Sequence, residues 1–161
     1  GRKRALSVAR KHRLAERLLA DVIGLDWSLV HEEACRWEHV MSEHVERRLF
    51  EMLDHPTESP YGNPIPALEV IGGTPARPFL EGVTRLTDLL SDPVDGELKR
   101  LGEPAQFDSA LLDTLHAAGI VPGAHIHAER RGDGEVAVSA DSVGREVVVD
   151  FETATHLYVS S

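Results

Sequence analysis

The sequence predicts an α+β protein in which three helices come first and a small β-barrel follows. Three observations support this prediction. Apolar residues recur at helical spacing up to residue 54, prolines and glycines crowd the next 25 or so positions, and short strand-like segments fill most of the remainder. We therefore expect a helical domain over residues 1–54, a Pro/Gly-rich linker over residues 55–80 and a barrel domain over residues 81–161.

The first predicted helix covers about residues 4–23, and Gly24 is its expected C-terminal stop. Asp26 can cap a second helix, which we expect to run to about Met41 with a narrow apolar stripe along one side. Ser42 can cap a third helix that ends before the first proline of the linker, because the residue before a proline disfavours the helical conformation.

The barrel domain is predicted from short segments of strand-like composition that are separated by turn residues. The candidate strands are Val83–Leu86, Gly96–Leu101, His125–Arg130, Glu135–Ala140, Glu146–Asp150 and Leu157–Ser160. One predicted helix, Asp108–Ala118, interrupts them. Several short strands in so short a stretch are typical of a small barrel.

Charge is unevenly distributed along the chain. Residues 1–54 hold ten Lys/Arg and ten Asp/Glu, whereas residues 55–161 hold seven and seventeen, so the net charge of -10 lies in the second part. Such an acidic surface repels a phosphate backbone, which makes these residues by themselves a poor candidate for nucleic-acid binding. No segment is apolar enough for a membrane span. The single cysteine, Cys35, cannot form an internal disulfide and fits the cytoplasm, where we expect the protein to be.

Side chains that can bind a metal gather on the second predicted helix. His31, Cys35, Glu38 and His39 share one flank of about 100° at the spacing of an α-helix, directly beside the apolar stripe. The first helix adds His12 and Glu16, which are one turn apart. Imidazole, carboxylate and thiol together favour a transition metal over Mg²⁺ or Ca²⁺.

Other interpretations of the same residues stay open at this point. A His/Glu pair one turn apart is usually a solvated helix face, and a lone half-buried cysteine is usually a small apolar filler. The run His31-Glu32-Glu33-Ala34-Cys35 also resembles the zinc-protease pattern H-E-x-x-H, but Cys35 stands where the second histidine belongs. Protease chemistry is therefore not expected, and the spacing by itself does not decide between metal binding and a structural role.

The residues that suggest a metal site also carry a family resemblance. Three segments, RKHRLAERLL (Arg10–Leu19), HEEACRWEHVMS (His31–Ser42) and SPYGNPIP (Ser59–Pro66), resemble the diphtheria toxin repressor and iron-dependent regulator family in the same order. The resemblance extends over the whole chain. It implies a winged helix-turn-helix, then a helical metal-binding dimerisation domain, then a tethered SH3-like barrel. Because the resemblance begins where the first domain ends, we expect the DNA-binding domain to be absent from this chain.

The resemblance implies two metal sites. An ancillary site would use His12, Glu16 and His31, and it would be closed by Glu103 and Gln106, which fit the family's E-x-x-Q pattern.

A primary, activating site would use Cys35, Glu38 and His39. Its remaining ligand in the family is a methionine of the DNA-binding domain, so we expect the primary site to be incomplete here. The thiol of Cys35 is similar to the iron-responsive branch, so Fe(II) is the expected metal. Co(II), Ni(II), Zn(II), Mn(II) or Cd(II) are expected to replace it in vitro.

The sequence thus predicts the metal-sensing and dimerising part of an iron(II)-dependent transcriptional repressor that controls iron homeostasis genes. Trp37, Val45, Leu49 and Phe50 are expected at a homodimer interface, with an intramolecular core as the alternative. The protein would bind a palindromic operator only through the missing domain, and we expect it to bind neither a membrane nor a small-molecule substrate. The alternatives are a manganese- or other metal-responsive regulator of the same family, a purely structural dimerisation module and a metal-dependent hydrolase. We do not expect an enzyme.

Overall fold

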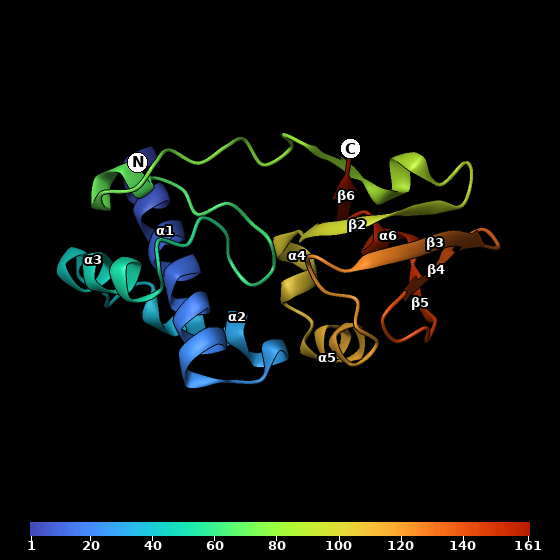
Figure 1. Cartoon of the computed structure of the whole chain (residues 1–161), viewed down its shortest axis with the longest axis horizontal. Helices are drawn as coiled ribbons and strands as arrows, with labels where there is room; N and C mark the ends of the chain where they lie inside the picture. The colour runs from blue at the N-terminus through green and yellow to red at the C-terminus, as the bar shows by residue number, and fades with distance from the viewer. The chain divides into compact units, whose positions relative to one another are not determined.

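The computed structural model describes all 161 residues, which form two compact units. The first unit, Gly1–Phe79, is built from helices, and the second, Leu80–Ser161, is built mainly from strands (Figure 1). A helical part followed by an antiparallel sheet confirms the predicted α+β class. No helix has the length and apolarity that a membrane crossing requires.

Three helices form the frame of the first unit, and their bounds are α1 Arg2–Leu18, α2 Trp27–Trp37 and α3 Glu43–Met52. A π-helical turn, Leu19–Ile23, extends α1 as far as Gly24, which takes a left-handed conformation with φ 76°. The side chain of Ser42 caps α3 as predicted, because its hydroxyl accepts a hydrogen bond from the backbone N–H of Val45 at 3.3 Å. The second helix ends four residues before the predicted Met41, and Trp37 is followed by a turn.

The core of the first unit combines residues from α1 and α3 with residues from the segment after α3. Its central cluster consists of Leu14, Phe50, Ile65, Leu68 and Ile71. Helices α1 and α3 are also joined by a buried ion pair, in which Arg10 donates to Glu46 at 2.6 Å. The position of α1 within the unit is therefore fixed by apolar packing and by charge pairing at once.

Most of the segment predicted to be a linker, residues 55–80, belongs to the first unit. Tyr61 and Ile65 are fully buried, and Arg13 of α1 donates to the carbonyl of Pro64 at 2.6 Å. Arg17 in the same way donates to the carbonyl of Glu58 at 2.7 Å. The helical unit thus reaches Phe79 instead of ending at residue 54, because prolines and glycines prevent long helices without preventing side-chain burial.

The second unit contains a six-stranded antiparallel sheet with the order β1-β6-β2-β3-β4-β5. The strands are β1 Val83–Arg85, β2 Val94–Leu101, β3 His125–Arg131, β4 Glu135–Ala140, β5 Val147–Asp150 and β6 Leu157–Ser160. The helices are α4 Glu103–Gln106, α5 Ser109–Ala117 and α6 Phe151–Ala154. All six predicted strands are present, and α5 lies within the predicted helix Asp108–Ala118, with Asp108 as its N-cap. Helices α4 and α6 were not predicted, since four residues are too few to show a helical period.

Candidate metal centre

Helices α1 and α2 bring a group of polar side chains together inside the first unit. His12 and Glu16 lie one turn apart on α1, and His31 lies on the facing side of α2. These three side chains are buried, with 5%, 1% and 3% of their residue surfaces exposed. Burial of polar groups is unfavourable unless they are paired, so this group calls for partners within the protein or for a bound ion.

The three side chains form a triangle of possible ligand atoms. His12 Nε2 lies 3.1 Å from His31 Nδ1 and 3.2 Å from Glu16 Oε2, and the third edge, from His31 Nδ1 to Glu16 Oε2, is 3.3 Å. Ligands at about 2.0–2.1 Å from one transition-metal ion are separated by about 3.0 Å at octahedral angles and about 3.4 Å at tetrahedral angles. The triangle therefore has the dimensions of one face of a metal coordination shell. We name these three residues the first ligand set.

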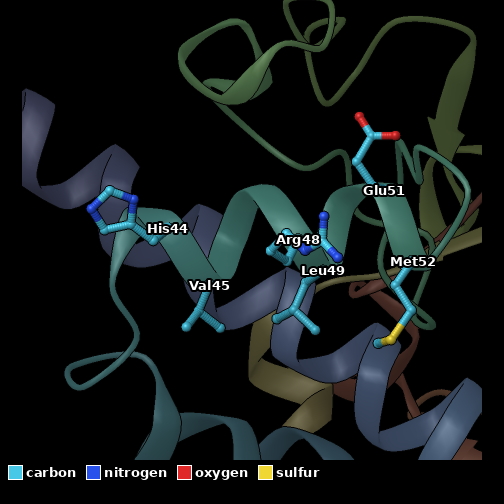
Figure 2. A pocket seen from close by; sticks show the side chains of 6 residues that line it. All are labelled: His44, Val45, Arg48, Leu49, Glu51 and Met52. Atoms are coloured by element: carbon cyan, nitrogen blue, oxygen red, sulfur yellow. The ribbon is translucent and has the colours of Figure 1, made fainter.

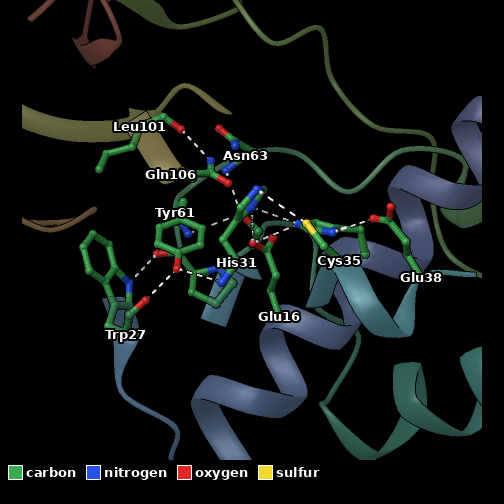
Figure 3. A network of polar contacts seen from close by, with 12 residues as sticks. Glu16, Trp27, His31, Cys35, Glu38, Tyr61, Asn63, Leu101 and Gln106 are labelled. Carbon is green, nitrogen blue, oxygen red and sulfur yellow. Dashed lines mark hydrogen bonds and ion pairs between the residues drawn. The ribbon is translucent and has the colours of Figure 1, made fainter. Parts of the chain in front are cut away.

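Each imidazole of the triangle turns its other nitrogen to a second pair of side chains. His12 Nδ1 lies 2.7 Å from Glu38 Oε2, and His31 Nε2 lies 3.8 Å from the sulfur of Cys35. Figure 3 shows Glu16, His31, Cys35 and Glu38 within this polar network. The ligand atoms of His12, His31 and Cys35 all lie within 4.8 Å of one another. The structure thus joins residues that the resemblance divides between two sites.

His39 is placed differently from the other predicted ligands. Because α2 ends at Trp37, His39 lies on the following turn, and its side chain is 69% exposed. Its Nε2 lies 3.2 Å from Glu38 Oε1. We name Cys35, Glu38 and His39 the second ligand set, of which Glu38 touches both His39 and the first set.

The electrostatics of the first ligand set favour an ion pair when no metal is bound. Burial lowers the pKa of His12, but the hydrogen bonds and charges of Glu16 and Glu38 outweigh it, and the pKa is raised above 6.5. Burial raises the pKa of Glu16, but hydrogen bonds from His12 and His31 outweigh it, and the pKa falls below 4.5. The carboxylate of Glu16 is therefore ready to bind a cation, whereas His12 has to lose a proton first.

Tyr61 holds the backbone of α2 next to the site through its hydroxyl, a role that sequence reasoning missed. Its hydroxyl donates to the carbonyl of Trp27 at 2.6 Å and accepts from the backbone N–H of His31 at 3.2 Å. The residue lies in the segment predicted to be a linker, where an aromatic side chain between prolines was the one available signal. Burial raises its pKa, so the hydroxyl keeps its proton and continues to donate.

The two ligands that the resemblance takes from the barrel lie in the second unit. Glu103 and Gln106 stand at the two ends of α4. The side-chain amide of Gln106 donates to the carbonyl of Leu101 at 3.0 Å.

The four residues predicted at a dimer interface differ in exposure. Phe50 is 3% exposed and belongs to the core cluster, and Leu49 is 7% exposed. Val45 is 48% exposed, and the indole N–H of Trp37 donates to Glu33 at 3.1 Å.

A depression on α3 is lined by His44, Val45, Arg48, Leu49, Glu51 and Met52. Figure 2 shows Val45, Leu49 and Met52 following one another along the same side of the helix.

Comparisons with known proteins identify one family. Residues 1–67 match the family described as the iron dependent repressor, metal binding and dimerisation domain. The iron-dependent repressor IdeR of Mycobacterium leprae is 51% identical over 140 residues, which are 86% of this chain and 61% of the relative. The diphtheria toxin repressor of Corynebacterium glutamicum is 42% identical over 157 residues, 98% of this chain and 68% of the relative.

Solved structures of metal-dependent repressors have a similar fold. A manganese-dependent transcriptional repressor has a TM-score of 0.80 at 28% identity, covering 99% of this chain and 83% of that protein. The IdeR of T. acidophilum has a TM-score of 0.76 at 32% identity, covering 97% and 67%. The chain thus spans about three fifths of the length of the first relative and two thirds or more of the others.

Proposed function

The chain belongs to the iron-dependent repressor family, and on that premise we propose that it is the metal-sensing and dimerising part of an iron(II)-responsive transcriptional repressor. Its relatives are repressors rather than enzymes, which removes the hydrolase alternative. Control of iron homeostasis genes by the whole protein belongs to this proposal.

The observation that carries the proposal is the triangle formed by the first ligand set. Two imidazole nitrogens and one carboxylate oxygen lie 3.1–3.3 Å apart in a buried position between two helices. Hydrogen-bonded side chains have the same separations, so these distances permit a metal ion, and the match of residues 1–67 to a metal binding domain is what favours one over a purely structural cluster. His12, Glu16 and His31 are therefore the residues that we expect to hold the ancillary ion. Glu103 and Gln106, which the resemblance adds to this set, remain predicted ligands.

The second ligand set supports iron over manganese as the signal. Cys35 offers a soft sulfur, which suits Fe²⁺, Co²⁺, Ni²⁺ or Zn²⁺ better than Mn²⁺. Manganese-dependent repressors are among the similar structures, so a manganese-responsive regulator is the second candidate. The two candidates share the overall fold, and the sulfur donor at position 35 is the feature that supports iron.

The metal-binding side chains explain how a sensor of this kind responds. A bound metal supplies a charge on which ligands from separate segments converge. The repressor conformation that offers more of these ligands is then more populated. The size of this shift depends on the difference in metal affinity between that conformation and the one with fewer ligands. His12 and His31 position the first set, while Cys35, Glu38 and His39 leave further coordination positions for a group from elsewhere in the repressor.

The depression on α3 is the surface that we propose for dimerisation (Figure 2). Val45 and Met52 expose 48% and 57% of their surfaces there, beside the more buried Leu49. A second copy of the chain is the proposed occupant, because the matching family is defined by dimerisation and a two-fold dimer suits a palindromic operator. The net charge of -10 supports contact with DNA through residues other than these.

Anaerobic calorimetric titration with Fe²⁺ or Co²⁺ tests the metal-sensing proposal. We expect one tight site per chain that is lost in a His12→Ala/Glu16→Ala variant. A His55→Ala variant is the matched control, since His55 is an exposed histidine of the same unit that lies outside both ligand sets and outside the depression on α3. Absence of saturable binding to the parent chain would contradict the proposal and leave dimerisation as the function of these residues.

A further inference from the structure

The two imidazoles of the first ligand set each face in two directions. His12 has Nε2 in the triangle and Nδ1 on Glu38, at 2.7 Å. His31 has Nδ1 in the triangle and Nε2 next to Cys35, at 3.8 Å. Members of the two ligand sets are therefore in direct contact through the imidazole rings.

The contact between His12 and Glu38 is the stronger of the two. A carboxylate can only accept, so the short distance means that His12 Nδ1–H donates to Glu38. The side chains are 6% and 19% exposed, which keeps water from competing for this bond. When His12 loses its second proton to bind a metal, its lone pair is therefore on Nε2, the nitrogen that points into the triangle.

This arrangement is what metal sites use to orient a histidine ligand. A carboxylate that accepts from one ring nitrogen fixes the tautomer and the ring orientation, and it makes the other nitrogen more basic. Glu38 stands in that position relative to the first ligand set, although it contributes no atom to the triangle. Its other oxygen, Oε1, remains next to His39 at 3.2 Å.

We propose that Glu38 is a positioning residue for the first ligand set as well as a member of the second, so that its carboxylate couples metal binding at the two sets. The proposal rests on the proposed metal-sensing function and adds a residue-level path for coupling. Ordering of His12 by metal at the first set also orders Glu38 for the second set, and by linkage the reverse holds with the same factor.

The alternative is that Glu38 acts in the second set alone. His39 separates the two possibilities, because it belongs to the second set and touches Glu38, yet its contact is with Oε1 on the exposed side. Loss of His39 should damage the second set while leaving the His12–Glu38 bond in place. Loss of the Glu38 carboxylate should damage both.

The experiment is an anaerobic Co²⁺ titration of the full chain and of Glu38→Gln, Glu38→Asp and His39→Ala variants, followed by absorption spectroscopy. Ligand-field bands without a thiolate charge-transfer band report the first set, since it contains no sulfur. We expect Glu38→Gln to weaken Co²⁺ binding at the first set by about 10–100-fold. Glu38→Asp, which withdraws the carboxylate by one methylene, should weaken it too, and His39→Ala should leave it within about 2-fold of the parent.

The possible results separate the two proposals. Parent chain without Co²⁺ binding at the first set would overturn the proposed function. Binding in the parent that Glu38→Gln and Glu38→Asp retain in full, or that His39→Ala loses equally, would overturn the coupling role and leave the sensing function standing. Circular dichroism of each metal-free variant shows whether it folds, and a loss of affinity in a folded Glu38 variant is the supporting result.

Discussion

His12 Nε2 and His31 Nδ1 lie 3.1 Å apart, although 19 residues separate them in the sequence. Their rings meet edge to face, with centroids 4.7 Å apart and planes at 64°. The contact places the first ligand set at the crossing of α1 and α2, so anything that shifts one helix against the other changes the distances between the ligand atoms.

The buried ion pair between α1 and α3 is expected to contribute strongly to stability. Glu46 is 0% exposed and accepts from both Arg10 and Lys11. Glu46→Ala leaves Arg10, itself 3% exposed, without its carboxylate and should lower the free energy of unfolding by about 3 kcal/mol. Urea denaturation of the metal-free chain measures this loss. Glu43→Ala, which breaks an exposed pair on the same helix, is the control and should change stability by less than about 1 kcal/mol.

The hydroxyl of Tyr61 is expected to matter both for stability and for metal affinity. Tyr61→Phe removes its hydrogen bonds to the Trp27 carbonyl and the His31 N–H, which should cost about 1–2 kcal/mol of unfolding free energy. Since His31 is then held less firmly, Co²⁺ affinity should fall as well. Tyr158→Phe in the second unit is the matched control, and an equal loss of metal affinity in both variants would argue against a specific role for Tyr61.

Metal affinity should rise with pH because of the raised pKa of His12. Below that pKa His12 carries a proton that competes with the metal, whereas Glu16, with its pKa lowered from 4.5, is ionised throughout. Affinity for Co²⁺ should therefore increase as pH rises from 6.5 through the raised pKa of His12. Titrations in two buffers of different ionisation enthalpy would show proton release on binding. An affinity that is constant over this range would contradict the assignment of His12 as a ligand.

The folding stability of the metal-free chain should change with pH in the opposite direction to metal affinity. The raised pKa of His12 stabilises the fold fully below 6.5 and loses its effect as pH rises through the folded-state value. The lowered pKa of Glu16 contributes above 4.5 and loses its effect as pH falls through the folded-state value. The ion pair should therefore stabilise the metal-free chain most between pH 4.5 and 6.5. In a His12→Ala variant, this part of the stability profile should be absent.

The donor atom at position 35 should set the order of metal preference. Cys35→Asp replaces a soft sulfur with a hard oxygen and should raise affinity for Mn²⁺ relative to Co²⁺ and Fe²⁺. Competition against a chromophoric chelator measures both affinities in the same variant. A Cys35→Ser variant controls for loss of sulfur without a new charge. If Cys35→Asp leaves the ratio unchanged, the proposed preference for iron over manganese loses its physical basis.

Much of the fold could be predicted from local patterns. Helical spacing and the cap Ser42 predicted helices that the structure contains, and turn residues separated the six strands. The early end of α2 at Trp37 was missed, because the apolar stripe continues to Met41, which is buried but lies after the turn that ends the helix. The burial of Tyr61 was missed as well, since composition indicates an irregular backbone but not what its side chains contact.

For the candidate metal centre, the residues could be predicted from the sequence better than the contacts between them. Helical phase brings His31, Cys35 and Glu38 to one flank, and spacing along the first helix adds His12 and Glu16. The bond between His12 and Glu38 depends on how α1 crosses α2, which a pattern along either helix does not contain. For the same reason the phase argument placed His39 with the others, whereas the end of α2 puts it on an exposed turn.

The most direct test of the central claim is anomalous diffraction from a crystal of the chain grown anaerobically with Co²⁺ or Fe²⁺. We predict one well-occupied ion at the crossing of α1 and α2, bound by His12 Nε2, His31 Nδ1 and a Glu16 oxygen. An ion found elsewhere with this triangle left as a hydrogen-bonded ion pair would contradict it.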